Sequence, residues 1–433
     1  MIKNSLLYQK LGSYYQNLLK FFEPISVRIT IKKANRLQKA EVIRLNNKNA
    51  FTCVFLVLDA SVWKCDSIYR ALQDNQSFNP SILVCPIANS GREIMIEKMN
   101  QCYNMFVSKG YKVIKSYDIR NDCYIDLREL SPDIIFYTNP YKGLIDDRYY
   151  VDKFIDKLSI YVPYYINGTN DYVMAYNQPM HNYCWKYYVE SSIHKTLAEK
   201  YSYSKGKNVV ISGYPGIEDF IRMDYNPIDP WKSKDKKLKR IVWAPHQTIE
   251  LSGSVNYSCF LQYADFMLEL AEKYKDKVQF AFKPHPLLKH RLEQKWGKSK
   301  ANEYYRKWAS MDNSIISDSD YHDLFLTSDA LIHDCGSFTV EYLYLNKPVM
   351  RLMNNINPRT MFSDFGISCI NQHYLAYKEE EIEEFIVNVI NSVDSMKEKR
   401  TQFINTVLRS DMKLPSIEII NDILYSLSHC KIS

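Results

Sequence analysis

Three short stretches combine the residue types that bind and transfer a phosphate group. Lys283-Pro284-His285-Pro286 and Trp243-Ala244-Pro245-His246 each place a histidine directly after an apolar run. Asp334-Cys335-Gly336-Ser337 follows the apolar run 330–333 and precedes a helical pattern that contains Thr339. Imidazoles and a cation at strand ends, together with hydroxyl groups and unpaired N–H groups at a helix start, suit a diphosphate. These stretches therefore predict a phosphate site.

The turn 334–337 is the centre of this predicted site. Ser337 is the expected N-cap of a helix over 338–345, where the N–H groups and the helix dipole favour an anion. Gly336 leaves room for a close approach, and His285 could donate to a leaving oxygen. The residues expected to bind the phosphates of a donor are Lys283, His246, Asp334, Gly336, Ser337 and Thr339. Ordinary strand-to-helix turns with incidental histidines are the alternative.

A further candidate for catalysis is His181, which lies just after Asn177-Gln178-Pro179. An imidazole titrates near neutral pH, at about 6.5, without special tuning. We therefore expect His181 to face an open cleft as the general base that takes a proton from an acceptor hydroxyl. The alternative is a histidine that caps a helix or lies in the core.

Apolar runs alternate with helical patterns along most of the chain. In the first half, strands are expected at 51–59, 81–87, 111–116, 133–139, 158–164 and 208–213, and helices at 60–73, 91–109 and 180–203. In the second half, strands are expected at 240–245, 278–283, 315–316, 330–333 and from Val349, and helices at 257–276, 287–310, 321–328, 338–345, 379–398 and 415–430. This alternation predicts an α/β fold with two doubly wound parallel sheets.

The composition of the chain places the predicted domain boundaries. Residues 224–239 are rich in proline, aspartate and lysine, which is typical of a linker. We expect a Rossmann-like acceptor domain over 50–223 and a Rossmann-like donor domain over 240–412, with their ligand-binding strand ends facing a central cleft. A C-terminal helix within 413–433 could pack back on the first domain.

The positive charge of the chain is concentrated at its start. Residues 1–50 hold ten lysines and arginines and two acids, a balance of +8, whereas the whole chain has a net charge of +7. The rest of the chain is therefore close to neutral, which argues against nucleic-acid binding. Within residues 1–49, an aromatic and aliphatic stripe flanked by basic residues predicts amphipathic helices, interrupted at Pro24, on an anionic membrane surface. Helices packed on the first domain are the alternative.

Several classes of protein do not fit the sequence. The ten cysteines are scattered and form no CxxC pair, so neither a zinc site nor a disulfide scaffold is expected. No apolar run is long enough for a transmembrane helix, and the start lacks the apolar core of a signal peptide. No GxGxxG follows the first strand, which disfavours a dehydrogenase. We expect a cytoplasmic protein held peripherally on the inner face of the membrane.

Taken in order, these motifs resemble the CDP-glycerol glycerophosphotransferase family, of the teichoic-acid primase and polymerase type. The residues that carry the resemblance are Gly213-Tyr214-Pro215, Trp243-Ala244-Pro245, Lys283-Pro284-His285-Pro286, Asp334, Ser337, Glu341, Lys347 and Pro348. The resemblance implies a GT-B fold, a CDP-alditol bound to the second domain, and neither a metal nor a resident cofactor. It also implies that His285 and the turn 334–337 contact the donor phosphates.

One departure from the family pattern concerns the base. The family commonly has a Trp-His-Gly-Thr segment whose histidine is regarded as the base, whereas this chain has Ile166-Asn167-Gly168-Thr169. Asn167 cannot take a proton, so the acceptor chemistry falls to His181 or differs from that of the family.

The function that these features predict is a transferase of cell-surface polysaccharide synthesis, for teichoic acid or capsule. It would move glycerol phosphate from CDP-glycerol to a hydroxyl of a lipid-linked or growing glycan acceptor and release CMP. The alternative is a GT-B glycosyltransferase that uses a nucleotide-sugar for capsule or O-antigen synthesis. A non-catalytic scaffold of a polysaccharide assembly complex is a third possibility. The sequence identifies neither the donor nor the acceptor.

Overall fold

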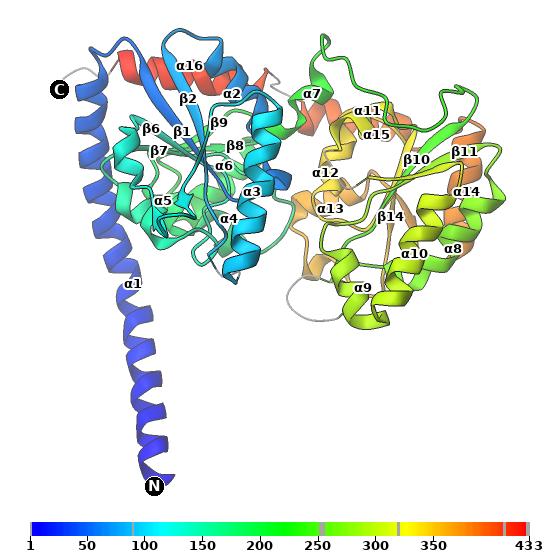
Figure 1. The fold of residues 1–433 in the computed structure, drawn as a ribbon, viewed down its shortest axis with the longest axis horizontal. Helices are drawn as coiled ribbons and strands as arrows, with labels where there is room; N and C mark the ends of the chain where they lie inside the picture. Colours follow the sequence, from blue (N-terminus) through cyan, green and yellow to red (C-terminus); the bar gives the residue numbers. More distant parts are fainter. Residues whose placement is uncertain (1, 89–90, 251–255, 318–320, 410–412, 430–433) are drawn as a thin grey trace. The chain divides into compact units, whose positions relative to one another are not determined.

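The chain folds into two compact units (Figure 1). The structure is a computed structural model that describes residues 2–88, 91–250, 256–317, 321–409 and 413–429, with side chains from residue 24 onward. Unit 1 comprises residues 1–164, 172–216 and 413–433, and unit 2 comprises residues 165–171 and 217–412. The C-terminal segment thus belongs to unit 1, and a short internal segment of the first half belongs to unit 2.

Unit 1 is built on a parallel sheet that has seven strands within the described residues, in the order β3-β2-β1-β6-β7-β8-β9. Its strands are β1 (Phe51–Val57), β2 (Phe78–Val84), β3 (Val113–Lys115), β6 (Ile134–Tyr137), β7 (Leu158–Tyr161), β8 (Lys186–Val189) and β9 (Val209–Ile211). Phe55 and Val57 pack into the core on one face, and Val54 and Leu56 pack into the core on the other. A near-continuous apolar run suits such a strand, because both of its faces are covered.

Helices cover both faces of this sheet. They are α1 (Ile2–Leu45), α2 (Asp66–Gln73), α3 (Arg92–Ser108), α4 (Tyr172–Tyr176), α5 (Pro179–Tyr183), α6 (Ser192–Tyr201) and α16 (Pro415–Ser428), with a small hairpin of β4 (Tyr117–Asp118) and β5 (Cys123–Tyr124). Ile419 and Ile423 of α16 are fully buried in the same core as β1, so the C-terminal helix is an integral part of unit 1.

Helix α1 is continuous through Pro24, so the prediction of two helices interrupted there is wrong. A proline inside a helix costs about 3 kcal/mol, which tertiary packing of the helix can offset. The buried residues of its described half recur every three or four positions, at Ile31, Ala34, Gln38, Val42 and Leu45. The side chains of residues 1–23 lie outside the described part, so the aromatic stripe and its membrane contact stay predictions. No helix among the described residues is long and apolar enough to span a bilayer.

Unit 2 repeats the architecture with a sheet of six parallel strands, counted over the described residues, in the order β12-β11-β10-β13-β14-β15. The strands are β10 (Lys239–Ala244), β11 (Val278–Phe282), β12 (Ser314–Ile316), β13 (Ala330–His333), β14 (Val349–Leu352) and β15 (Tyr374–Ala376). Because the chain enters at the central β10 and winds to both sides, the strand order reverses between β10 and β13. Ligands of such sheets bind at the carboxyl ends of the strands beside this reversal.

The helices of unit 2 connect these strands. They are α7 (Glu218–Ile221), α8 (Phe260–Lys273), α9 (Leu288–Trp296), α10 (Lys298–Ser310), α11 (His322–Thr327), α12 (Phe338–Glu341), α13 (Asp364–Ile370), α14 (Glu379–Ile390) and α15 (Lys397–Phe403). The predicted helix 287–310 is two helices, because Gly297 adopts a φ of +84° that breaks the α conformation. The predicted helix 180–203 is likewise divided, since β8 lies inside it.

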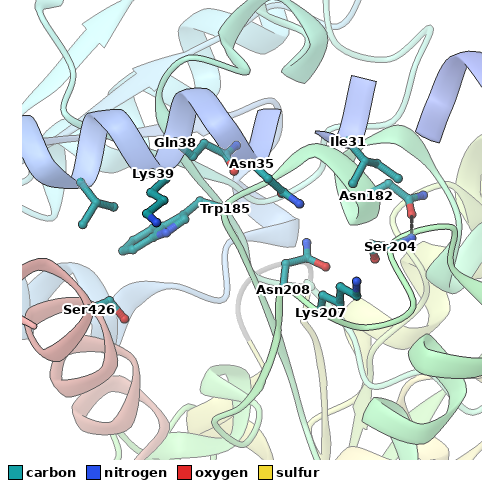
Figure 2. A pocket seen from close by; sticks show the side chains of 11 residues that line it. Ile31, Asn35, Gln38, Lys39, Asn182, Trp185, Ser204, Lys207, Asn208 and Ser426 are labelled. Carbon is teal, nitrogen blue, oxygen red and sulfur yellow. Dashed lines mark hydrogen bonds between the residues drawn. The ribbon is translucent and has the colours of Figure 1, made fainter. Parts of the chain in front are cut away.

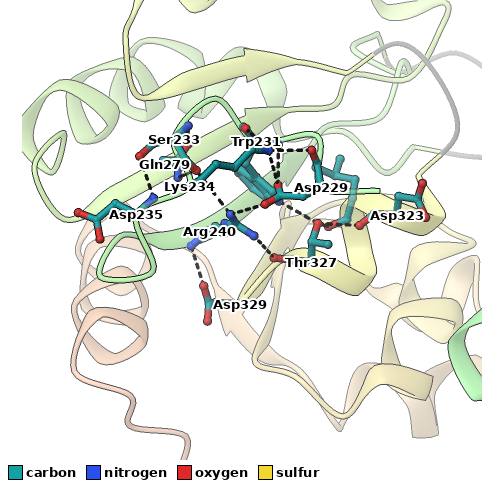
Figure 3. Close-up of polar contacts among 11 residues, drawn as sticks. Asp229, Trp231, Ser233, Lys234, Asp235, Arg240, Gln279, Asp323, Thr327 and Asp329 are labelled. Carbon is teal, nitrogen blue, oxygen red and sulfur yellow. Dashed lines mark hydrogen bonds and ion pairs between the residues drawn. The ribbon is translucent and has the colours of Figure 1, made fainter. Parts of the chain in front are cut away.

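The predicted linker 224–239 is anchored to unit 2, as Figure 3 shows. Asp229 accepts from Arg240 at 2.9 Å, and the Trp231 indole donates to the Thr327 hydroxyl at 2.9 Å. Trp231 is only 2% exposed. Because a buried indole fixes this stretch, the proline- and lysine-rich composition marks a surface segment of unit 2 rather than a free linker.

Candidate functional site

Three adjacent strands of unit 2 deliver the predicted phosphate residues to one edge of the sheet. Strand β10 lies between β11 and β13, so the loops that follow them are neighbours. The His285 N–H donates to the Pro245 carbonyl at 3.0 Å, and the Cys335 thiol donates to the Ala244 carbonyl at 3.1 Å. The rings of His246 and His285 have centroids 4.9 Å apart. The structure therefore brings together the three motifs that the sequence predicted as a site.

Asp334 holds these loops in place. It is fully buried, and its carboxylate accepts from the backbone N–H of His246 at 2.5 Å and of Cys259 at 2.7 Å. Burial raises the pKa of Asp334 to about 6, while these donors and the Arg351 guanidinium oppose the rise. With both oxygens engaged inside the protein, Asp334 positions the site, and its geometry does not fit the predicted contact with a donor.

His246 and His285 use the same ring nitrogen, Nδ1, to accept a hydrogen bond from the backbone. Nδ1 of His285 accepts from the Leu287 N–H at 3.2 Å, and Nδ1 of His246 accepts from the Thr248 N–H at 3.3 Å. Burial lowers the pKa of His285 to about 4, helped by Lys283, and lowers the pKa of His246 to about 3, helped by His285. Both rings are therefore neutral at pH 7 and carry their proton on Nε2, where it can be donated to an anion.

The turn after β13 keeps two N–H groups available. Among the described residues, no acceptor pairs with the backbone N–H of Gly336 or Ser337. Ser337 occupies the predicted N-cap position of α12, but its side chain makes no capping bond. A Cβ on Gly336 would lie 3.0 Å from the Tyr257 ring. Glycine is therefore required at position 336 because Tyr257 packs tightly over the turn, whether or not a ligand binds there.

Thr339 is not available to a ligand. It is fully buried, and its hydroxyl donates to the Cys335 carbonyl at 2.9 Å and accepts from Arg351 at 2.8 Å. Arg351 also donates to the Cys335 carbonyl at 2.7 Å. The predicted contact of Thr339 with the donor is therefore wrong, because two internal bonds occupy the hydroxyl and fix the turn.

Arg351 is the main residue that the sequence reasoning missed. Its guanidinium is buried, lies 4.8 Å from the centroid of the Phe362 ring, and holds the turn that contains Gly336. Burial lowers its pKa, although Asp334 and Tyr257 oppose the shift. An arginine inside the otherwise apolar run 349–352 was the available signal, because a charge is placed in a buried strand only with partners.

A cavity of about 590 Å³ opens beside His285. Its lining is cationic and aromatic, with Lys289, Arg306 and Tyr305. The ammonium group of Lys289 lies 5.3 Å from the centroid of the Tyr305 ring. Lys283 is only 9% exposed, lies 5.9 Å from the centroid of the Tyr321 ring, and adds a further positive charge behind His285. The cavity is large enough for part of a nucleotide and carries the opposite charge.

His181 lies in the core of unit 1. It is 1% exposed, packs against the rings of Tyr161 and Tyr187, and accepts from the Gln178 N–H at 2.9 Å as part of a capping box. Burial lowers its pKa to about 3. The expectation that His181 faces an open cleft is therefore wrong, and its geometry is that of a structural histidine.

Asn167 lies in the short segment 165–171 that belongs to unit 2 rather than to the first domain. Its carboxamide oxygen accepts from the N–H of Thr169 at 3.0 Å and from the Thr169 hydroxyl at 2.8 Å. The Gly168 carbonyl accepts from the Ser363 N–H at 2.9 Å. The segment is thus a turn fixed on α13. The predicted first domain, residues 50–223, includes this segment, whereas the structure assigns it to unit 2.

Comparison with known protein families shows to which family the chain belongs. Residues 168–424, more than half of the chain, match the model of a family described as CDP-Glycerol:Poly(glycerophosphate) glycerophosphotransferase. The chain belongs to this family. It is therefore a transferase, and the resemblance inferred from its motifs is confirmed. No curated protein matches the chain.

Solved structures confirm the fold class. A variant of the wall teichoic acid polymerase TagF is 14% identical, with a TM-score of 0.58, over 96% of this chain and 98% of that chain. The UDP co-structure of S. aureus MnaA is 15% identical, with a TM-score of 0.53, over 87% of this chain and 96% of that one. The UDP-GlcNAc 2-epimerase from Neisseria meningitidis bound to UDP-GlcNAc is 12% identical, with a TM-score of 0.50, over 86% and 99%. These similarities show the GT-B fold of two Rossmann-like units.

The buried histidines predict how stability depends on pH. Burial holds the pKa of His181 and His246 at about 3 and that of His285 at about 4. The unfolded value is about 6.5, so below that pH the unfolded chain binds protons that the folded chain does not. The free energy of unfolding should fall as pH drops from about 6.5 toward 4, by up to about 1.4 kcal/mol per pH unit for each histidine.

Chemical denaturation at a series of pH values tests this dependence. Asp334 partly offsets the loss of stability at acidic pH. Its pKa is raised to about 6 in the folded state, so the folded chain binds one proton there that the unfolded chain does not. In the His181→Gln variant, the free energy of unfolding should depend on pH less steeply, by the contribution of one proton. Equal free energies of unfolding across the acidic range would contradict the burial of neutral imidazoles.

Proposed function

We propose that the chain transfers glycerol phosphate from CDP-glycerol to a hydroxyl group of a lipid-linked or growing glycan acceptor and releases CMP, in the synthesis of teichoic acid. The acceptor oxygen forms a bond to the β-phosphorus, and the bond from that phosphorus to the bridging oxygen breaks. The electron pair of that bond leaves with CMP, and the proton of the acceptor hydroxyl passes to water as the new bond forms. Membership in the glycerophosphotransferase family supports the class of donor.

The single observation that carries this proposal is the pair of neutral imidazoles at adjacent strand ends. His246 and His285 have ring centroids 4.9 Å apart, and each directs an Nε2 proton away from an occupied Nδ1. Such donors stabilise charge on the phosphoryl and diphosphate oxygens without reorganisation during the reaction. The N–H groups of Gly336 and Ser337 and the charge of Lys283 would act on the same anion.

The role we assign to His285 is that of a hydrogen-bond donor. Phosphoryl transfer leaves little covalent chemistry to the protein, and positioning and charge stabilisation supply most of the catalysis. A histidine whose Nδ1 accepts from the Leu287 N–H holds its proton on Nε2, which suits donation better than proton abstraction. The contact of Lys283, His246 and Ser337 with the donor remains part of the proposal.

Two further parts of the proposal concern partners. The exposed side of α1 carries Arg28, Lys32, Lys33, Arg36 and Arg44, which would favour an anionic membrane surface beside a lipid-linked acceptor. This would place the protein at the inner face of the membrane. The transfer is expected to need neither a metal nor a resident cofactor, so chelation of divalent ions should leave the rate unchanged.

Release of nucleotide from a panel of activated donors tests the function. The purified protein, supplied with a glycerol-phosphate-primed acceptor, should release CMP from CDP-glycerol at a rate well above the release of CDP or UDP from nucleotide-sugars. Release from a UDP-sugar alone would favour the glycosyltransferase alternative and overturn the proposal. If the protein bound the donors but released nucleotide from none of them, a non-catalytic scaffold would be favoured.

A further inference from the structure

A second cavity lies within unit 1, and only unit 1 residues line it (Figure 2). It has a volume of about 310 Å³ and lies between α1, the end of α16, and the segments that precede β8 and β9. Besides the apolar side chains of Ile31, Val42 and Trp185, its lining contains amides, hydroxyls and two ammonium groups. A polar cavity of this size suits a small polar ligand.

The electrostatics of this cavity favour an anion. Lys39 and Lys207 line it and make no ion pair within 4.0 Å among the described residues, and no carboxylate lines it. The nearby Lys186 is already neutralised, because its ammonium group lies 2.7 Å from Asp422 and 2.7 Å from the Ser426 hydroxyl. Two uncompensated cations at one small cavity are the arrangement that a phosphate group neutralises.

A buried acceptor in the same cavity indicates a second feature of the ligand. The amide nitrogen of Asn208 donates to the His181 carbonyl at 2.9 Å and to the Cys184 carbonyl at 3.0 Å, which fixes the orientation of the side chain. Its carboxamide oxygen is buried and has no hydrogen-bond partner. Such an oxygen costs free energy unless a donor reaches it, and a hydroxyl group of a ligand can supply that donor.

The cavity wall is also held in a fixed shape. Asn182 donates to the Asn177 side chain at 3.1 Å and accepts from the Ser204 N–H at 2.8 Å, and Gln38 of α1 donates to the Tyr183 carbonyl at 2.8 Å. Gln38 is only 2% exposed, so this bond is shielded from water. The amides that fix the wall therefore leave Asn208 and the two lysines to meet a ligand.

We propose that this cavity binds a phosphate ester that carries a neighbouring free hydroxyl, of the size of glycerol phosphate. The phosphate lies between Lys39 and Lys207, and the hydroxyl donates to the carboxamide oxygen of Asn208. This inference does not rest on the proposed transfer, because residues of unit 1 alone form the cavity. The same chemistry occurs in a phosphatidylglycerol headgroup and in a poly(glycerol phosphate) chain.

Calorimetric titration of the full chain with sn-glycerol 3-phosphate tests the site. The wild-type protein should bind it saturably, and the Lys39→Gln/Lys207→Gln variant should bind at least roughly tenfold more weakly. The matched control is Lys32→Gln/Lys200→Gln, which removes one exposed lysine from α1 and one from α6, neither of which lines the cavity. Equal weakening in both variants, or no saturable binding to the wild type, would overturn the proposal.

Four further titrations separate the remaining outcomes. Inorganic phosphate should bind more weakly than glycerol 3-phosphate, because it cannot place a carbon-borne hydroxyl at Asn208; equal affinity would overturn the assignment of the hydroxyl. The His285→Ala variant should bind glycerol 3-phosphate as the wild type does, so failure of the unit 2 site and failure of this site are distinguishable. Phosphatidylglycerol vesicles and a soluble poly(glycerol phosphate) fragment then identify the natural ligand. The Lys39→Gln/Lys207→Gln variant should bind that ligand more weakly than the wild type does, and should bind the other ligand as the wild type does.

Discussion

Replacing His285 with alanine should lower CMP release from CDP-glycerol by about a hundredfold or more while leaving the fold intact. The ring is half-buried, so its removal leaves a gap at the edge of the cavity rather than in the core. Loss of one preorganised donor to a developing charge typically costs about two to three orders of magnitude in rate. Single-turnover nucleotide release and thermal unfolding, measured on the same preparation, check both parts of this expectation.

Two companion variants make the His285 result specific. His290→Ala changes an exposed histidine on α9 that contacts Gln294 at 3.1 Å, and it should alter the rate by less than about twofold. His285→Gln keeps a hydrogen-bond donor and should recover part of the rate. If His285→Ala retained nearly full activity, or if His290→Ala fell equally, the proposed role of His285 would be untenable.

The largest effect on stability is expected from Gly366→Ala. An added Cβ would lie 2.1 Å from the Gly168 carbonyl oxygen and 3.0 Å from the Phe362 ring. The first of these is a backbone atom, so no side-chain rotation relieves the clash, and overpacking of this kind costs about 3 kcal/mol or more. We expect the segment 165–171 to lose its bonds to Ser363 and Met361 and the midpoint of denaturant unfolding to fall.

Gly91→Ala is the matched control for this substitution. Nothing lies within 4 Å of a Cβ at Gly91, which precedes α3 as its N-cap. Its cost should be at most about 1 kcal/mol, that of a changed cap residue. Indistinguishable unfolding midpoints for the two variants would contradict the close approach of Gly168 and Gly366.

Local patterns in the sequence were sufficient for most of the fold. The strands β1, β10, β11 and β13 were predicted because buried parallel strands are continuous apolar runs with clear ends. Strand β8 was missed, since Lys186–Val189 is short and lies among residues with helical spacing. The identity of a four-residue strand is set by its neighbours β7 and β9, which are distant in the sequence.

The candidate site divides in the same way. His246 and His285 were found because a histidine after an apolar run and a proline is a local signal of a strand end. The burial of His181 was not predictable, because Tyr161 and Tyr187 come from two separate strands. Nor does any local pattern show that residues 165–171 leave one unit to pack on the other. Such contacts are set by tertiary structure alone.

On the proposed function, the strand ends of β10, β11 and β13 bind the diphosphate of the donor. An experimental structure of the protein with CDP-glycerol bound tests it most directly. We expect diphosphate oxygens within hydrogen-bond distance of Nε2 of His285 and of the Ser337 N–H, with His246 beside them. A nucleotide bound elsewhere, with both imidazoles out of reach of its phosphates, would show that these strand ends are not the donor site.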